Sequence, residues 1–153
     1  MELPRAVADT NVLVAAAITP RGVCGRLLEA AIDGRWQLVA SPLLMAELDE
    51  VLARGKFRRW LSEQEAVQFV ADVRVLADVV ADPGVSSAPE TVDPKDEFLV
   101  ALARVADVVA LVSGDPHLTE LVDLDPPVIT PAAFMDRLQD WRKRERGSPT
   151  EPA

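Results

Sequence analysis

Near its N-terminus the chain reads RAVADTNVLV, residues 5–14. The short apolar run Arg5–Ala8 predicts a buried β-strand that ends at Asp9. A carboxylate placed between two apolar segments is costly to bury unless a partner compensates it. Asp9 is therefore either the N-terminal cap of a helix that starts near Asn11, or a functional group at the end of the strand.

Further apolar runs indicate more strands. Val108–Val112 predicts a second buried strand, which leads through a Ser-Gly turn to Asp115, and Gln37–Ala40 and Pro127–Ile129 are weaker candidates. Helical stretches alternate with these strands, a pattern typical of a parallel sheet with helices on both faces. The sequence thus predicts an α/β fold in which helices sandwich a central, mostly parallel sheet.

Several helix starts carry recognisable signals. Ser41-Pro42, Thr130-Pro131 and Asp93-Pro94 each place a capping side chain before a proline at the first helical position. Ser62 and Glu65 fit a capping box that opens a helix through about Leu76.

The length of 153 residues, 49% of them apolar, suits one domain with a single core. We expect this domain to span residues 1–145, with the Pro-rich segment Asp82–Val92 as a connection within it. The polar tail, residues 146–153, is expected to be disordered.

A single cysteine, Cys24, excludes an internal disulfide framework and a thiolate zinc cluster. Its apolar surroundings predict a buried small residue in a reducing compartment. No run of about 18 apolar residues and no signal-peptide pattern is present, so we expect a cytoplasmic protein without membrane contact. The net charge of −9 disfavours general adhesion to nucleic acid or anionic lipid. Any nucleic-acid binding must then be local and assisted by metal.

Two more acidic residues interrupt apolar helix faces. Glu47 shares a face with Leu44, Leu48 and Val51, so it either points inward or lies at the edge of the stripe, paired with an arginine. Asp96 precedes an apolar helix face and should point toward the sheet. An acidic first turn, with Asp93 as the cap, also has an ordinary helix-dipole explanation.

Together these acids predict a metal site. Ligands of open parallel sheets bind beyond the carboxyl ends of the strands, where Asp9 and Asp115 would lie, and Glu47 and Asp96 could complete the ring. Clustered carboxylates repel one another strongly, and a cation would stabilise them. Oxygen-only ligation favours Mg²⁺ or Mn²⁺ over zinc, and the corresponding chemistry is hydrolysis of a phosphodiester by an activated water.

The ordered set of motifs resembles the PIN-domain ribonucleases, most closely the toxin components of VapC-like toxin–antitoxin pairs. The resemblance runs from about Val7 to Phe134. It rests on DTNVLV (residues 9–14), Ser41-Pro42 followed by Glu47, DPKDEFLVALA (93–103), SGDPHL (113–118) and ITPAAF (129–134).

The resemblance implies a three-layer α/β/α fold and a catalytic, metal-binding quartet of Asp9, Glu47, Asp96 and Asp115. It also implies cleavage of single-stranded RNA segments that leaves a 5′-phosphate, a homodimer, and an antitoxin partner whose tail inserts basic side chains into the acidic site. Residues that match positions orienting or assisting the acids are Asn11 and Ser113, with Thr10 and Asp93 as weaker matches.

The stretch Arg54–Trp60 is the best local counterweight to the negative charge. Arg54, Lys56, Arg58 and Arg59 could hold RNA phosphates while the aromatic residues stack on bases, although a helix end with a tucked Phe and Trp explains the pattern as well. The other basic cluster, 141–146, suits either a binding role or cations that stabilise a helix C-terminus.

His117 is the sole histidine, and a metal-activated water would not require it. Two other functions remain open. One is phosphoryl transfer with Asp9 as nucleophile, although the second residue after it is Asn11 rather than an acid. The other is a non-catalytic module whose acids only receive a basic peptide.

Overall fold

Five parallel strands form the centre of the computed structural model, which describes residues 3–84, 92–93, 96–121 and 123–147. The strand order is β3-β2-β1-β4-β5. The strands are β1 (Arg5–Ala8), β2 (Gln37–Ala40), β3 (Asp78–Val79), β4 (Ala110–Val112) and β5 (Val128–Ile129). The chain first builds the sheet outward from β1 to β3 and then resumes on the other side of β1, so the order reverses at the β1–β4 pair. That pair is the switch point at which open parallel sheets bind their ligands.

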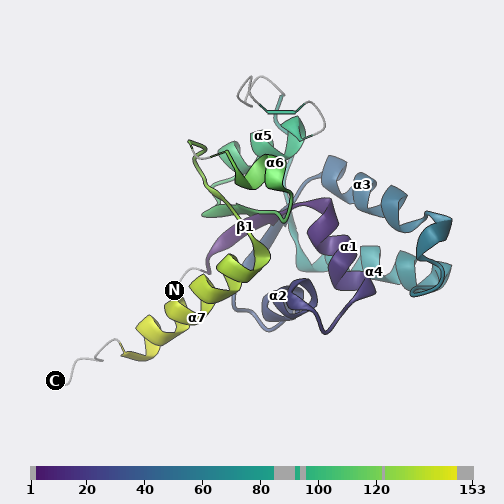
Figure 1. The fold of residues 1–153 in the computed structure, drawn as a ribbon, viewed down its shortest axis with the longest axis horizontal. Coiled ribbons are helices and arrows are strands. Elements are labelled where there is room, and N and C mark those ends of the chain that lie inside the picture. Colours follow the sequence, from purple (N-terminus) through teal and green to yellow (C-terminus); the bar gives the residue numbers. More distant parts are fainter. Residues whose placement is uncertain (1–2, 85–91, 94–95, 122, 148–153) are drawn as a thin grey trace.

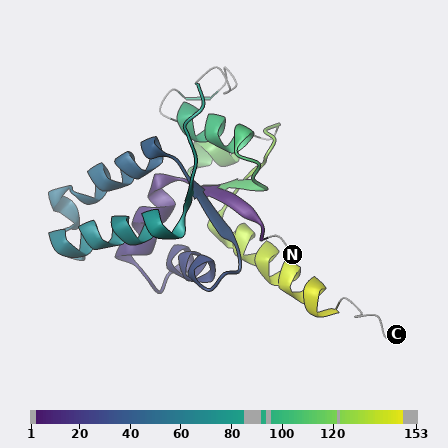
Figure 2. The same ribbon diagram turned by 180° about the vertical axis from the view of Figure 1, so that it is seen from behind.

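Helices cover both faces of this sheet, which confirms the predicted α/β/α architecture. They are α1 (Thr10–Ile18), α2 (Val23–Ile32), α3 (Pro42–Leu52), the 3₁₀ helix η1 (Gly55–Phe57), α4 (Glu63–Leu76), α5 (Glu97–Val105), α6 (Pro116–Thr119) and α7 (Pro131–Gly147). α5 packs on β1 and β4 from one side, whereas α1, α2 and α7 lie on the other side (Figures 1 and 2).

Four of the five strands were predicted from the sequence, and β3 was not. β1 and β2 have the predicted bounds, whereas β4 begins at Ala110, two residues later than expected. β3 was not predicted, because only Asp78 and Val79 form it and the apolar run that starts at Val79 is only three residues long. It is held as a strand by parallel pairing with β2.

Most predicted helix starts are confirmed by their capping bonds. The hydroxyl oxygen of Ser41 accepts from the Leu44 N–H, and Ser62 and Glu65 form the complete capping box of α4. The predicted start at Asp93-Pro94 is wrong. α5 begins at Glu97 with Asp96 at its N-cap, because the Asp93 carbonyl accepts from the Asp96 N–H at 2.8 Å and closes a turn ahead of the helix.

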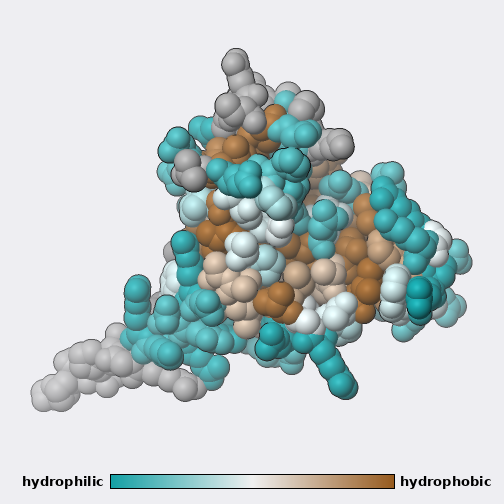
Figure 3. All heavy atoms as spheres, viewed as in Figure 1, coloured by the Kyte–Doolittle hydropathy of each residue, from teal (hydrophilic) through white to brown (hydrophobic). Residues whose placement is uncertain are grey.

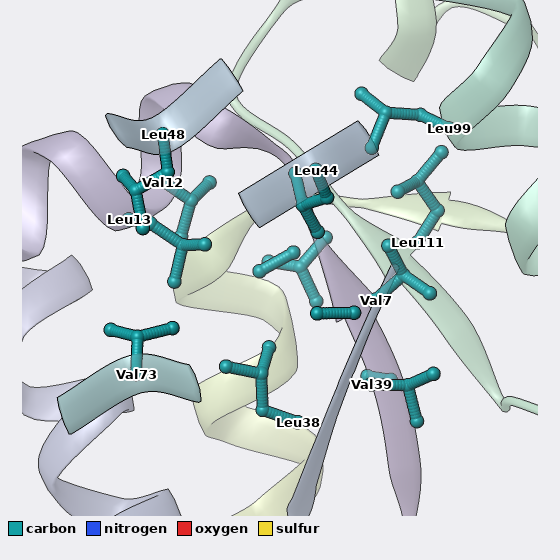
Figure 4. Close-up of a cluster of buried hydrophobic side chains, with 14 of the residues drawn as sticks. Val7, Val12, Leu13, Leu38, Val39, Leu44, Leu48, Val73, Leu99 and Leu111 are labelled. Atoms are coloured by element: carbon teal, nitrogen blue, oxygen red, sulfur yellow. The ribbon is translucent and has the colours of Figure 1, made fainter. Parts of the chain in front are cut away.

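Buried aliphatic side chains from the sheet and its helices form one core (Figure 4). Val7 of β1 and Leu111 of β4 lie near Leu44 of α3 in this cluster. β1, β2 and β4 are largely buried on both faces and therefore read as continuous apolar runs in the sequence. The strands position the site, because two of the predicted acids follow their carboxyl ends.

α2 and α7 pack together beneath the sheet. The Trp36 ring meets Phe134 edge-on, with ring centres 5.2 Å apart, and its indole N–H donates to the Leu27 carbonyl. Gly25 allows α2 to approach the loop that precedes it, since a Cβ at this position would lie 2.0 Å from the Pro20 carbonyl oxygen.

Other expectations are refined. Cys24 is half-buried rather than buried, and burial raises the pKa of its thiol, with a smaller contribution from the charge of Asp9. α7 continues through Gly147, so the first two residues of the expected tail are helical, and the rest lie outside the described residues. Residues 85–91 of the predicted connection also lie outside them. Among the residues that are described, no helix is both long and apolar enough to cross a bilayer.

Candidate metal centre

All four acids of the predicted quartet line one cavity of about 390 Å³. Asp9 follows β1 and Asp115 follows β4, so the two neighbouring strands at the switch point bring them together. Glu47 reaches the cavity from α3, and Asp96 reaches it from the start of α5. Residues separated by more than a hundred positions in the sequence thus share one space, here called the acid cavity.

Asp9 is both a helix cap and a member of the acid cavity. Asp9 is only 4% exposed. Its Oδ1 accepts from the Val12 N–H at 3.0 Å, so the interpretation of Asp9 as a helix cap is confirmed. Its Oδ2 accepts from the Ser113 hydroxyl, which lies at the end of the neighbouring strand. The two interpretations of Asp9 therefore describe the two oxygens of one carboxylate.

Ser113 ties the two strand ends together. Its fully buried hydroxyl donates to Asp9 and accepts from the Asp115 N–H at 3.0 Å. Asp115 in turn caps the short helix α6 by accepting from the His117 N–H through its Oδ1. The turn-forming interpretation of this segment is also correct, and it orients Asp115 toward the acid cavity.

Glu47 points inward and is held by Thr10. The buried Thr10 hydroxyl donates to Glu47 Oε2 at 2.6 Å, which joins the first turn of α1 to the middle of α3. Glu47 is partly exposed, and within the described chain no arginine forms an ion pair with it, so the predicted pairing with an arginine is wrong.

Asp96 occupies a capping position without using its side chain as a cap. Its carboxylate accepts no capping bond from the α5 backbone, and it lies in the wall of the acid cavity. A capping aspartate normally spends one oxygen on the first turn of its helix. The Asp96 carboxylate is instead left for the cavity.

Burial and mutual repulsion shift two of these carboxyl groups. Burial raises the pKa of Asp9, against the hydrogen bonds from Ser113, Val12 and Asn11, and the charge of Asp115 raises it further. Burial also raises the pKa of Asp96, followed by the charges of Asp115, Asp93, Asp9 and Glu47. The acid cavity therefore disfavours its own ionised state.

A divalent cation fits the donor chemistry of this cavity. Its carboxylates offer the hard oxygen ligands that Mg²⁺ and Mn²⁺ take, and in the described part of the chain none of the four predicted acids forms an ion pair with Arg54 or Lys56 of the same wall. Within the described chain no three His, Cys, Asp or Glu side chains are close enough to hold one ion directly. An ion here would keep several waters, which is the usual habit of Mg²⁺.

The remaining predicted site residues divide by their contacts. Thr10, a weaker match in the sequence, makes an orienting hydrogen bond to Glu47. Asn11, a stronger match, donates its backbone N–H to Asp9, and its exposed side chain lies in the cavity wall. Asp93 and His117 are exposed residues of the same wall. The bond between Thr10 and Glu47 had no sequence signal beyond the position of Thr10 directly after Asp9.

The structure separates the four predicted RNA-binding cations. Arg54 and Lys56 line the acid cavity. Arg58 instead donates to the Leu52 carbonyl at the end of α3, and the guanidinium of Arg59 lies 4.9 Å from the centre of the Trp60 ring. Phe57 is partly buried as expected for a helix end.

Two further observations correct or complete the sequence analysis. Trp60 is 53% exposed rather than tucked. The wall of the acid cavity also contains the apolar side chains of Val14, Val51, Phe57 and Leu99, of which only Phe57 belongs to a stretch predicted to bind RNA.

Comparisons with known proteins agree with this geometry. The chain is 23% identical to the uncharacterized protein MJ1680 of Methanocaldococcus jannaschii over 119 residues, which cover 78% of this chain and 76% of that protein. Its fold resembles the crystal structure of PAE2754 from Pyrobaculum aerophilum, with a TM-score of 0.65 and 19% identity over 90% of each chain.

A family model described as the PIN domain matches residues 5–117, a range that includes all four acids of the cavity. PIN domains are generally nucleases, a class of hydrolase, and usually use divalent metal ions. Because the match spans most of the sequence, this chain belongs to the PIN domain family.

Proposed function

We propose that this protein is an endoribonuclease that uses Mg²⁺ or Mn²⁺ to hydrolyse phosphodiester bonds in single-stranded segments of RNA. The observation that carries the proposal is the convergence of Asp9, Glu47, Asp96 and Asp115 on one cavity at the switch point of the sheet. Burial and neighbouring acids raise the pKa of Asp9 and of Asp96, and a bound cation would offset that repulsion.

The four carboxylates would hold the ion together with several of its waters, and the bound ion would activate a water and stabilise the leaving oxygen. Ser113 fixes Asp9 and the start of the Asp115 turn, and Thr10 fixes Glu47. These hydroxyl groups keep the carboxylate oxygens directed into the cavity without adding charge. The nearby His117 is exposed and is not required for the reaction.

The test is incubation of the purified chain with a mixed RNA pool and Mn²⁺, with and without chelator. Wild-type protein should cleave RNA in a chelator-sensitive manner, and Asp96→Asn should abolish cleavage. Glu65→Gln is a matched control, since this carboxylate caps the exposed start of α4. Cleavage that survives both chelator and Asp96→Asn contradicts the proposal.

Binding of RNA without any metal-dependent cleavage would instead support a non-catalytic binding module. A phosphorylated intermediate trapped on Asp9 would support phosphoryl transfer. Either result replaces the nuclease assignment.

We further infer that the protein is the toxin of a toxin–antitoxin pair, acts as a homodimer in the cytoplasm, and is inhibited by a basic antitoxin segment. The ordered motifs support this role, and an acid cavity suits cationic side chains. Induced expression of wild-type protein should arrest growth of a bacterial host, whereas Asp96→Asn should not. Light scattering of the purified chain tests the dimer.

A further inference from the structure

The acid cavity has one basic side. In the described chain, Arg54 and Lys56 are the only Lys or Arg side chains that line it, and both come from the short segment after α3. Arg54 is the N-cap of η1, and Lys56 is inside that helix. The end of the molecule that carries η1 and the start of α4 is hydrophilic in Figure 3.

These two cations are not used by the carboxylates that surround them. The one ion pair within 4.0 Å in the described part of the chain is Arg5–Asp78, at the opposite end of the strands. If Arg54 and Lys56 served only to neutralise the acids, they would be expected to pair with them. Both side chains are exposed at the cavity wall and remain able to bind an anion.

Their neighbours, in contrast, have structural duties. Arg58 donates to the Leu52 carbonyl and so caps the end of α3. Arg59 stacks over Trp60, away from the cavity-lining residues. The Lys56 ammonium lies 5.1 Å from the centre of the Phe57 ring, a contact that holds a cation in place without neutralising it.

The backbone position between the two cations is exposed. Gly55 separates them, and a Cβ added at Gly55 would meet no atom within 4 Å. Its backbone has no left-handed conformation that requires glycine. A larger residue can therefore be placed at position 55 without a clash.

We propose that Arg54 and Lys56 form a phosphate clamp, which binds a backbone phosphate of the RNA next to the phosphate that is cleaved. This inference rests on the proposed function and explains how a chain of net charge −9 retains its substrate. The carboxylates repel a polyanion, so attraction must come from cations beside them. Contacts to phosphate position a nucleic acid without reading its sequence.

The first experiment measures binding separately from cleavage. A fluorescein-labelled single-stranded RNA is titrated with protein in chelator at several salt concentrations, using wild type, the double variant Arg54→Ala/Lys56→Ala, and Arg59→Ala. The double variant should bind at least about tenfold more weakly, and its slope of log affinity against log salt should fall by about 0.7, the value for one lost phosphate contact on a single strand. Arg59→Ala removes one cation from the same segment and should change the affinity by less than about twofold.

A second experiment leaves both cations in place. Gly55→Glu inserts a carboxylate between them, and Gly55→Gln inserts a neutral side chain of nearly the same shape. Gly55→Glu should weaken RNA binding several-fold relative to Gly55→Gln, and thermal unfolding of both variants checks that they fold. Equal affinities for the two variants would overturn the clamp.

Cleavage assays with Mn²⁺ distinguish failure of the clamp from failure of the nuclease assignment. The double variant should raise the apparent KM for RNA and leave kcat within about threefold of wild type. Metal-dependent cleavage with an unchanged KM and salt slope overturns the clamp and leaves the nuclease in place. RNA binding that depends on Arg54 and Lys56, without cleavage by any form of the protein, supports the clamp and overturns the nuclease.

Discussion

Two helix N-caps in this protein use the same kind of hydrogen bond in different surroundings. At the start of α4, Ser62 and Glu65 exchange hydrogen bonds with each other's backbone N–H groups at an exposed surface. At the start of α1, Asp9 also accepts a backbone N–H, but it is buried and its second oxygen is bonded to Ser113 across the sheet. The first cap is complete within four residues, whereas the second depends on a distant strand.

The two caps also differ in the effect that ionisation of their carboxyl groups has on stability. Hydrogen bonds from Ser62 lower the pKa of Glu65, so ionisation stabilises that cap. Burial and neighbouring acids raise the pKa of Asp9 and Asp96, so ionisation destabilises the acid cavity. A capping pattern therefore does not exclude function. The features that distinguish Asp9 are its burial beside other acids and a charge that opposes folding.

The largest expected effect is on Asp96. Asp96→Asn removes a charge that burial and four neighbouring acids disfavour, so the metal-free protein should become more stable. The same change should lower cleavage by about a hundredfold or more, since it removes a charged ligand oxygen. Urea unfolding in chelator and an RNA cleavage assay measure the two effects. A loss of both stability and activity would show that Asp96 is a structural residue.

Ser113→Ala should have the next largest effect. It removes the hydroxyl that donates to Asp9 and accepts from the Asp115 N–H. Leaving those buried groups without a partner should cost about 1–3 kcal/mol of unfolding free energy. Cleavage should fall by about 10–100-fold, the usual effect of losing a residue that orients a metal ligand. Full activity would mean that Ser113 does not orient Asp9.

The dependence of stability on metal and pH should show that the charges of Asp9 and Asp96 oppose folding. The folded chain holds the protons of Asp9 and Asp96 more tightly than the unfolded chain does. Their contribution to stability is therefore fully present below the ordinary aspartate pKa of about 3.9 and is lost as pH rises through the raised folded pKa. Adding Mn²⁺ at neutral pH should restore about 2.7 kcal/mol at a hundred times its Kd. Chelator titrations monitored by urea unfolding measure this gain.

Glu65 should show the opposite pH dependence. Because its pKa is lowered, its contribution is present above the ordinary glutamate pKa of about 4.3 and is lost as pH falls through the folded pKa. The difference in stability between wild type and Glu65→Gln should therefore shrink on acidification. A difference that grows in acid would contradict the assigned direction.

The smallest effect should come from Ser62→Ala. It removes the hydroxyl that accepts the Glu65 N–H and should cost about 1 kcal/mol of unfolding free energy. RNA cleavage at a temperature well below unfolding should stay at the wild-type level, because Ser62 does not line the acid cavity. Loss of activity would connect this cap to the site and weaken the contrast with Asp9.

The sequence was most informative where structure is local. Ser62, Glu65 and the bounds of β1 and β2 follow from neighbouring residues, and the structure confirms them. β3 was missed because parallel pairing with β2, rather than residue type, makes Asp78 and Val79 a strand. The α5 start was misplaced because the turn closed by the Asp93 carbonyl precedes the helix.

The acids that line the cavity could also be singled out from the sequence, because Asp9, Glu47 and Asp96 interrupt apolar patterns and Asp115 follows a predicted strand. Their supporting contacts could not, since Thr10 meets Glu47 across 37 positions and Ser113 meets Asp9 across 104. The basic segment shows the same limit. Arg54 and Lys56 differ from Arg58 and Arg59 only through the path of the chain after α3.

The most direct measurement is a crystal structure of the protein soaked with Mn²⁺, using the anomalous signal of the metal to locate it. The account predicts a peak inside the acid cavity, in contact with carboxylate oxygens of the Asp9, Glu47, Asp96 and Asp115 group, and loss of that peak in Asp96→Asn. A fully occupied Mn²⁺ outside the cavity, with the four carboxylates unchanged around water alone, would contradict it.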